Sequence, residues 1–122
     1  MPLLQLTIDA KIDGASVPGW PVTIVKDADE AAVFNFTHAG DSNDTSFTAL
    51  PIGEVDSVEA LLFLTNSAAG IRVEGGEGTN VAIRLAAGGG LVIWGSSLTD
   101  TNVTANINSA TAGQMLGAAV GT

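Results

Sequence analysis

The chain has 122 residues, of which 46% are hydrophobic and 14% are charged, and its formal net charge at pH 7 is −9. The length suits one domain with its own core, and the apolar fraction excludes a disordered chain. Four scattered Lys and Arg residues against 13 acidic ones exclude the clustered positive charge that nucleic-acid binding requires.

The chain has no cysteine, so it contains no disulfide framework, thiolate nucleophile or thiolate metal site. Residues 1–14 meet acidic side chains early and lack the apolar stretch of a signal peptide. No run approaches the roughly eighteen apolar residues of a membrane-spanning helix. We therefore expect a protein made in the cytoplasm, with neither a membrane nor a nucleic acid as its partner.

Alternation of apolar and polar residues predicts three strands in the first third of the chain. Apolar side chains recur at every second position of residues 4–12, which is typical of a half-buried strand. Asp13-Gly14 then predicts a turn. Residues 20–26 and 32–36 repeat the alternation, and residues 38–46 form a loop rich in residues that favour Asx turns.

Two segments in the middle of the chain depart from the alternating pattern. Residues 47–50 predict a short segment before Pro51, and an acidic connector follows, which separates two sheets of one domain. Within this connector we expect at most a single helical turn, over residues 55–60. The continuous apolar run 61–64 predicts a central strand with both faces covered.

Short alternating runs separated by glycine predict the remaining strands, so the fold class is all-β. We expect an antiparallel β-sandwich, jelly-roll-like, with about nine or ten short strands, formed by residues 1–122 as a single domain. In residues 91–94 the pattern leaves open which pair faces the core, Leu91 with Ile93 or Val92 with Trp94. The predicted late strands lie at residues 71–73, 81–85, 91–94, 103–107 and 116–120, with glycine-rich reversals at 75–78 and 88–90.

One polar loop has part of a calcium-binding pattern. Asp41, Asn43 and Thr45 show the alternating oxygen ligands of a calcium loop. Ser46 stands where that loop needs glycine, and Ile52 stands where it needs a bidentate glutamate. We therefore interpret the segment as an Asx-rich turn, with calcium as the minor alternative.

The chain offers no other candidate for catalysis, a cofactor or a metal. His38 is the single histidine, and we interpret it as a solvated loop residue. The glycines of residues 75–78 precede a predicted strand, whereas a phosphate-binding loop leads into a helix. The acidic clusters fall in predicted loops, where solvation is the ordinary role, and they are Asp29/Glu30, Glu54/Asp56/Glu59 and Glu74/Glu77. We expect no enzyme, no cofactor and no metal.

The two tryptophans, Trp20 and Trp94, allow two interpretations. An exposed tryptophan on a β-sandwich can stack on a sugar ring, which would make this a carbohydrate-binding module. Burial at a core edge or in a subunit interface is the interpretation we prefer. Candidate core or interface anchors are therefore Trp20, Phe34, Phe36 and Trp94.

The second half of the chain resembles a group of small tailed-phage virion proteins of the β-sandwich type. The likeness is a pattern of strands: an apolar strand ending in Phe-x-x-Asn, a second strand after a short loop, and a strand that leads through a glycine turn into another apolar strand. Two further strands end the chain, and the first half fits more loosely. The residues that carry the pattern are 61–66 (LLFLTN), 71–73 (IRV), 81–85 (VAIRL), 86–90 (AAGGG), 91–94 (LVIW), 102–107 and 114–120.

This resemblance implies a virion structural protein, and we predict a capsid decoration (cement) protein that stabilises the assembled shell by binding between coat subunits. Its partners would be the major capsid protein or another virion protein, and copies of itself, with a homotrimer favoured by the resemblance. A tail or head–tail accessory protein and a carbohydrate-binding module are the alternatives. Residues 1–6 form a candidate contact arm. The candidate partner-binding residues are Leu3, Leu4, Leu6, Trp20 and Trp94.

Overall fold

The structure, a computed structural model, describes residues 2–43, 47–72, 83–99 and 103–122. Within these ranges all regular structure is β-strand, with twelve strands and no helix. The strands are β1 (Leu3–Ile8), β2 (Lys11–Ile12), β3 (Ala15–Ser16), β4 (Val22–Asp27), β5 (Glu30–His38), β6 (Thr48–Ala49), β7 (Ser57–Thr65), β8 (Ala69–Arg72), β9 (Ile83–Leu85), β10 (Gly90–Thr99), β11 (Thr104–Ile107) and β12 (Gly113–Gly121).

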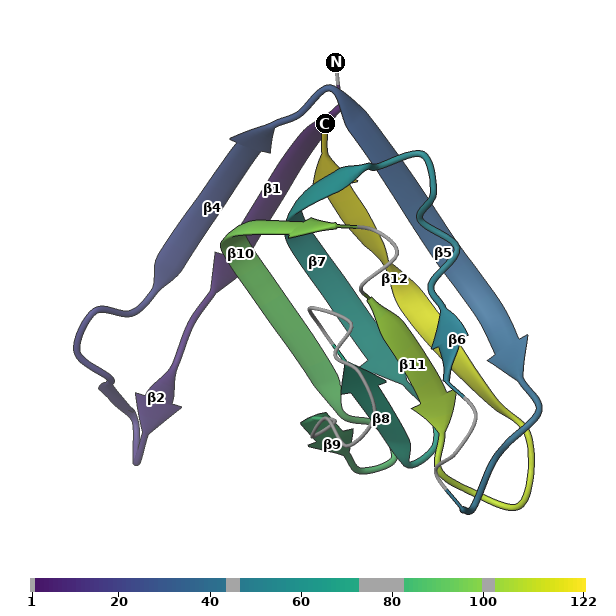
Figure 1. Ribbon diagram of the computed structural model, residues 1–122. Helices are drawn as coiled ribbons and strands as arrows, with labels where there is room; N and C mark the ends of the chain where they lie inside the picture. Colours follow the sequence, from purple (N-terminus) through teal and green to yellow (C-terminus); the bar gives the residue numbers. More distant parts are fainter. Residues whose placement is uncertain (1, 44–46, 73–82, 100–102) are drawn as a thin grey trace.

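Two four-stranded antiparallel sheets pack face to face (Figure 1). The first has the order β10-β7-β12-β5, and the second has the order β6-β11-β8-β9. The predicted antiparallel β-sandwich is confirmed. The connector before β7 leads from the second sheet to the first, but it does not separate the two sheets along the chain, because each sheet contains strands from both sides of it. Three of the twelve strands have two residues each, which leaves nine longer ones. The jelly-roll likeness stays a prediction.

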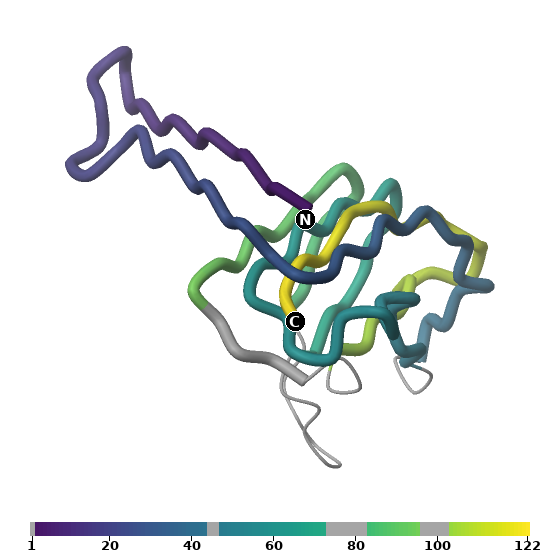
Figure 2. Tube along the Cα trace, turned by 90° about the horizontal axis from the view of Figure 1, so that it is seen from above, coloured from purple at the N-terminus to yellow at the C-terminus, as the bar shows by residue number. Residues whose placement is uncertain are grey.

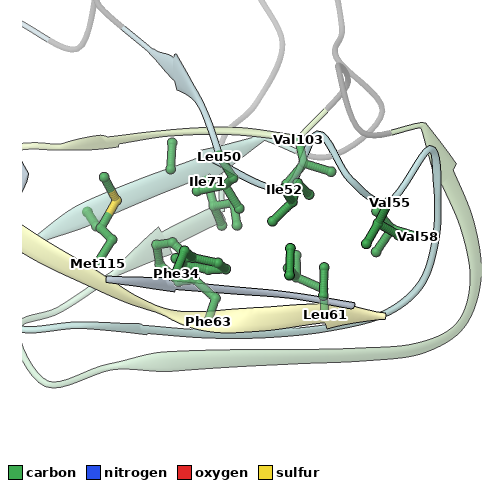
Figure 3. Close-up of a cluster of buried hydrophobic side chains, with 14 of the residues drawn as sticks. Phe34, Leu50, Ile52, Val55, Val58, Leu61, Phe63, Ile71, Val103 and Met115 are labelled. Carbon is green, nitrogen blue, oxygen red and sulfur yellow. The ribbon is translucent and has the colours of Figure 1, made fainter. Parts of the chain in front are cut away.

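The core lies between the two sheets (Figure 3). Period-2 alternation turns Phe34, Phe63 and Met115 of the first sheet toward Ile71 and Ile107 of the second, and all five are buried. The connector closes one side with three further buried residues, Leu50, Ile52 and Val55. In β10 the pair that faces the core is Leu91 with Ile93, which settles the choice that the sequence left open.

The prediction that the apolar run 61–64 has both faces covered is wrong, although its strand is central. Leu61 and Phe63 are fully buried in the core, but Leu62 is half-buried and Leu64 is 57% exposed. The reason is the two-layer architecture, in which each sheet buries one face against the other. The outer face of the first sheet needs a different cover.

A β-bulge interrupts β7 near its start. Ala60 pairs with Val120 of β12 and with Trp94 of β10. The next residue of β7 that pairs with either strand is Val58, so Glu59 is left out of both pairings. Val58 and Leu61 therefore both reach the core although three positions separate them. The helical turn expected over residues 55–60 is not present, because this segment enters β7 at Ser57.

The first strands form a long hairpin, which we call the arm (residues 3–27). β1 pairs with β4 along its whole length, and β2 pairs with β3 at the tip. The predicted turn between β2 and β3 is confirmed: Asp13 and Gly14 have φ values of 51° and 79°, the two positive angles that a type I′ hairpin needs. Figure 2 shows the arm extending away from the sandwich. The arm is thus longer than the predicted segment 1–6.

We predict that Phe63→Ala lowers the free energy of unfolding by about 3–5 kcal/mol, because it leaves a cavity between the sheets. Val33→Ala is the matched control: Val33 lies in the same sheet, is 84% exposed, and should change stability by less than about 0.5 kcal/mol. Urea denaturation followed by circular dichroism measures both. Equal effects of the two variants would contradict the assigned core.

Candidate functional site

The base of the arm packs on the outer face of the first sheet. Leu4 contacts a small buried cluster formed by Ala28, Ala60 and Val120. Two backbone hydrogen bonds fix the same place: the N–H of Ala28 donates to the carbonyl of Pro2, and that of Asp29 donates to the carbonyl of Gly121, both at 3.0 Å. The arm is therefore fastened near the beginning of β1 and the end of β12.

Two side-chain contacts hold the arm further along. The ammonium of Lys26 lies 3.0 Å from a carboxylate oxygen of Glu59, so the bulge in β7 supplies the arm's ion-pair partner. The rings of Trp20 and Trp94 meet edge to face, with centroids 6.5 Å apart and planes at 87°. Both contacts join β4 or the loop before it to the first sheet, so they set the direction in which the arm leaves the sandwich.

A pocket of about 310 Å³ lies beside these contacts. Its floor includes the indole of Trp94, which is 41% exposed, and Ala60. Its walls come from β4 of the arm and include Thr23 and the Lys26–Glu59 pair. An aromatic surface next to charged hydrogen-bonding groups is chemically suited to a sugar ring, which presents an apolar face and a rim of hydroxyls.

A second hollow, which we call the apolar cleft, lies between β1 and the same sheet face. It measures about 300 Å³ and has no charged residue in its lining. Leu6 of the arm forms one side, and Leu62, Leu64 and Val92 of β7 and β10 form the other. The exposed large apolar residues on the outer face of the first sheet are Val33, Leu64, Val92 and Trp94.

The structure separates the predicted partner-binding residues into two groups. Leu4 and Leu6 face the sandwich, and Trp20 and Trp94 contact each other further along the arm, beyond the Ile8–Val22 end of the β1–β4 pairing. Leu3 points the other way and is 55% exposed.

Sequence reasoning did not single out six further exposed apolar side chains among the described residues, which are Ile12, Val25, Val33, Leu64, Ile83 and Val92. One sign of this exposed apolar surface was present in the sequence, because Leu3 and Val25 are apolar residues on the hairpin face whose other residues are polar. The sequence did not say which face stays uncovered.

The interpretation of His38 as a solvated loop residue is wrong. His38 ends β5, is 7% exposed, and its Nδ1 accepts hydrogen bonds from the backbone N–H groups of Gly40 at 3.0 Å and Ile107 at 3.3 Å. The backbone therefore occupies Nδ1. Gly40 has a φ of 96° and lies against the carbonyls of Ser109 and Thr111, so the ring joins the ends of both sheets.

The Asx turn is confirmed where the structure describes it, because the Asp41 carboxylate accepts a hydrogen bond from the N–H of Asn43 at 3.0 Å. Thr45 and the glycines of residues 75–78 lie outside the described residues. Among the residues that are described, no group of three or more His, Asp or Glu side chains is placed to hold a metal ion. The same residues include no helix that is long and apolar enough to cross a bilayer.

Comparison of the chain with protein-family models and with curated protein sequences finds no match. Any assignment of function therefore depends on the surfaces just described and on the strand pattern of the second half.

We predict that His38→Ala destabilises the fold by about 2–4 kcal/mol, because two buried backbone N–H groups lose their acceptor and a cavity forms. His38→Asn should cost less, since the Asn side-chain oxygen can take the place of Nδ1. Thr37→Ala, at the exposed neighbouring position, is the control. Thermal and urea unfolding measure all three, and an Asn variant as unstable as the Ala variant would exclude the acceptor role.

Proposed function

We propose that the protein is a virion structural protein, and specifically a capsid decoration protein that binds between coat subunits. The observation that carries the proposal is the arm, a 25-residue hairpin (residues 3–27) that extends from a β-sandwich and has exposed apolar residues along its length. Large exposed apolar surfaces mark interaction sites on proteins. An extended arm suits a partner with a groove between subunits, as an assembled shell has.

The contact surface in this proposal is the face of the arm that points away from the sandwich. In the β1–β4 pairing Leu4 lies opposite Lys26 and Leu6 lies opposite Ile24, and these positions face the first sheet. Because side chains alternate along a strand, Leu3 and Val25 lie on the other face of the arm. They are 55% and 60% exposed. Leu4, Leu6, Trp20 and Trp94 have a supporting role here, because they hold the arm in position for that contact.

Binding of this kind stabilises a shell by mass action. A protein that binds the assembled lattice and not the free coat subunit lowers the free energy of the assembled state by RT ln(1 + c/Kd) for each site, where c is its free concentration. Since the contact is apolar, salt should weaken it only modestly, as screening acts on exposed charges. The strand-pattern resemblance supports a location in the virion, and a tail or head–tail position would use the same surface.

We predict that the protein co-sediments with the assembled capsids of the virus that encodes it, at low and at high salt, and raises their disruption temperature. The double variant Leu3→Asp/Val25→Asp should lower the affinity by at least about tenfold, because it places charge in an apolar contact. Ile83→Asp, at a 40% exposed position on the other sheet, is the matched control. Absence of binding at both salt concentrations would contradict the decoration role.

The pocket beside Trp94 favours one second candidate, a carbohydrate-binding module. The half-exposed indole would stack on the sugar ring, and Glu59 and Lys26 would accept and donate hydrogen bonds at its rim. Val25 lines this pocket as well as belonging to the decoration surface, whereas Leu3 lies outside the pocket, so Leu3→Asp and Trp94→Ala are the variants that separate the two functions.

We predict for this second candidate that neutral oligosaccharides release heat in calorimetric titration and that Trp94→Ala abolishes the signal. Glu59→Gln should weaken binding by about tenfold, because a charged acceptor is lost. Val33→Ala, outside the pocket, should leave the titration unchanged. No heat with a panel of neutral, acidic and amino sugars would exclude the module.

A further inference from the structure

We propose that two copies of the protein pair edge to edge through β5, so that their first sheets join into one continuous antiparallel sheet across a two-fold axis. In the described part of the chain, β5 has β12 as its single strand neighbour and forms the border of the sheet (Figure 1). Its other side presents unpaired backbone N–H and C=O groups, which a further strand can bind. This contact lies apart from the outward face of the arm and from the pocket beside Trp94, so it depends on neither proposed function.

The backbone of β5 is free on that side. Among the described residues, no hydrogen bond from a turn, a loop or a side chain reaches the backbone of residues 31–37. The connector that follows β6 bonds instead to Val103, to itself and to the end of the chain. Because backbone groups recognise another extended backbone, the partner of this edge is a β-strand.

The other edges of the two main sheets carry the features by which proteins prevent such pairing. In the second sheet the edge strands β6 and β9 have two and three described residues. In the first sheet β10 is long, but a register shift between Trp94 and Leu98 and the φ of 71° at Gly95 make it irregular. By contrast, β5 has nine residues, pairs with β12 without a register shift, and contains no lysine or proline. Of these four edges, β5 alone is both long and regular.

The side chains of β5 also favour pairing. Residues 31–37 (AAVFNFT) include no charged residue, although the whole chain carries a net charge of −9. Valine, phenylalanine and threonine favour strands, and Val33 is 84% exposed. A long edge that stays in solvent is ordinarily protected by charged side chains, lysine above all. Their absence lets two acidic molecules approach each other through this strand.

A second β5 matches this edge in length and in its two faces. Antiparallel pairing centred on Phe34 aligns all nine residues of both strands, because Phe34 then lies opposite Phe34 of the partner subunit. Residues opposite each other share a face of the sheet, so Ala32 lies opposite Phe36 of the partner subunit, and both face the core. A small residue thus meets a large one at two places, and both copies keep their second sheet on the same side.

The same register keeps the acidic residues of the two strands apart. Glu30 is the one acidic residue of β5 and stands at its beginning. In the antiparallel pair the two Glu30 residues lie at opposite ends, about 26 Å apart at about 3.3 Å per residue, which is about three Debye lengths at physiological salt. A parallel pair would place them side by side. The two-fold contact is closed, so it predicts a dimer, whereas the sequence resemblance favours a trimer.

Sedimentation velocity over a concentration series tests the pairing with the full chain. One strand from each copy makes a small interface, so the wild type should form a reversible dimer with a dissociation constant between about 1 μM and 1 mM. Val33→Lys should weaken it by at least about tenfold, because it places two lysines near the two-fold axis, although it lowers the net charge of each copy. Leu64→Lys is the matched control: it makes the same charge change on the same face, but on β7, both of whose edges are paired. Circular dichroism confirms that each variant is folded.

Disulfide cross-linking tests the register, since the chain has no cysteine of its own. Val33 lies opposite Asn35 of the partner subunit, with Cα atoms about 4.5–5.5 Å apart, which a disulfide can span. The diagonal distance between the two Val33 residues is about 7–8 Å, which exceeds that span. A mixture of Val33→Cys and Asn35→Cys should therefore give more cross-linked dimer under mild oxidation than either variant alone.

Three results overturn the proposal. The first is a wild-type protein that remains monomeric up to about 1 mM. The second is an association that Val33→Lys leaves unchanged or that Leu64→Lys weakens equally, because the contact would then lie on another surface. The third is an equal yield of cross-linked dimer from the cysteine mixture and from the single variants, because the strands would then not pair in the two-fold register.

Discussion

A two-layer sandwich can bury one face of each sheet, and this constraint determines how the rest of the chain is arranged. The inner faces meet in a core of branched aliphatic and aromatic residues. The outer face of the β10-β7-β12-β5 sheet is apolar over β7 and β10, with Leu62, Leu64, Val92 and Trp94, whereas β5 and β12 place the polar residues Asn35, Thr37 and Gln114 there. The arm covers only the beginning of this face, where Leu4 and Leu6 lie, and it leaves Leu64 and Val92 exposed.

The bulge in β7 connects that constraint to the direction of the arm. Skipping Glu59 keeps Val58 and Leu61 in the core and at the same time places the Glu59 carboxylate within 3.0 Å of Lys26. The neighbouring strand β10 accommodates the bulge at Gly95, which has a φ of 71°. Gly95 directly follows Trp94, whose ring contacts the ring of Trp20. One irregularity in the first sheet therefore provides both side-chain contacts that orient the arm.

Period-2 alternation predicted most strands correctly, because it reports local geometry: β1, β4 and β5 and the Asp13-Gly14 turn all follow from neighbouring residues. It did not predict what depends on distant parts of the chain. An apolar run shows that both faces of β7 are apolar, but not that Leu64 stays uncovered. His38 is buried because Ile107, 69 positions further along, donates to its ring. The candidate site was found in part, since Trp20 and Trp94 were named but their contact was not predictable.

The net charge of the chain limits association through its exposed apolar residues. The part of the chain outside the arm carries −8 of the total charge of −9. At physiological salt the repulsion between exposed charges fades over a Debye length of about 8 Å, so it acts only when two copies approach closely. Like charge of this size opposes nonspecific contact between the apolar residues that the first sheet leaves exposed.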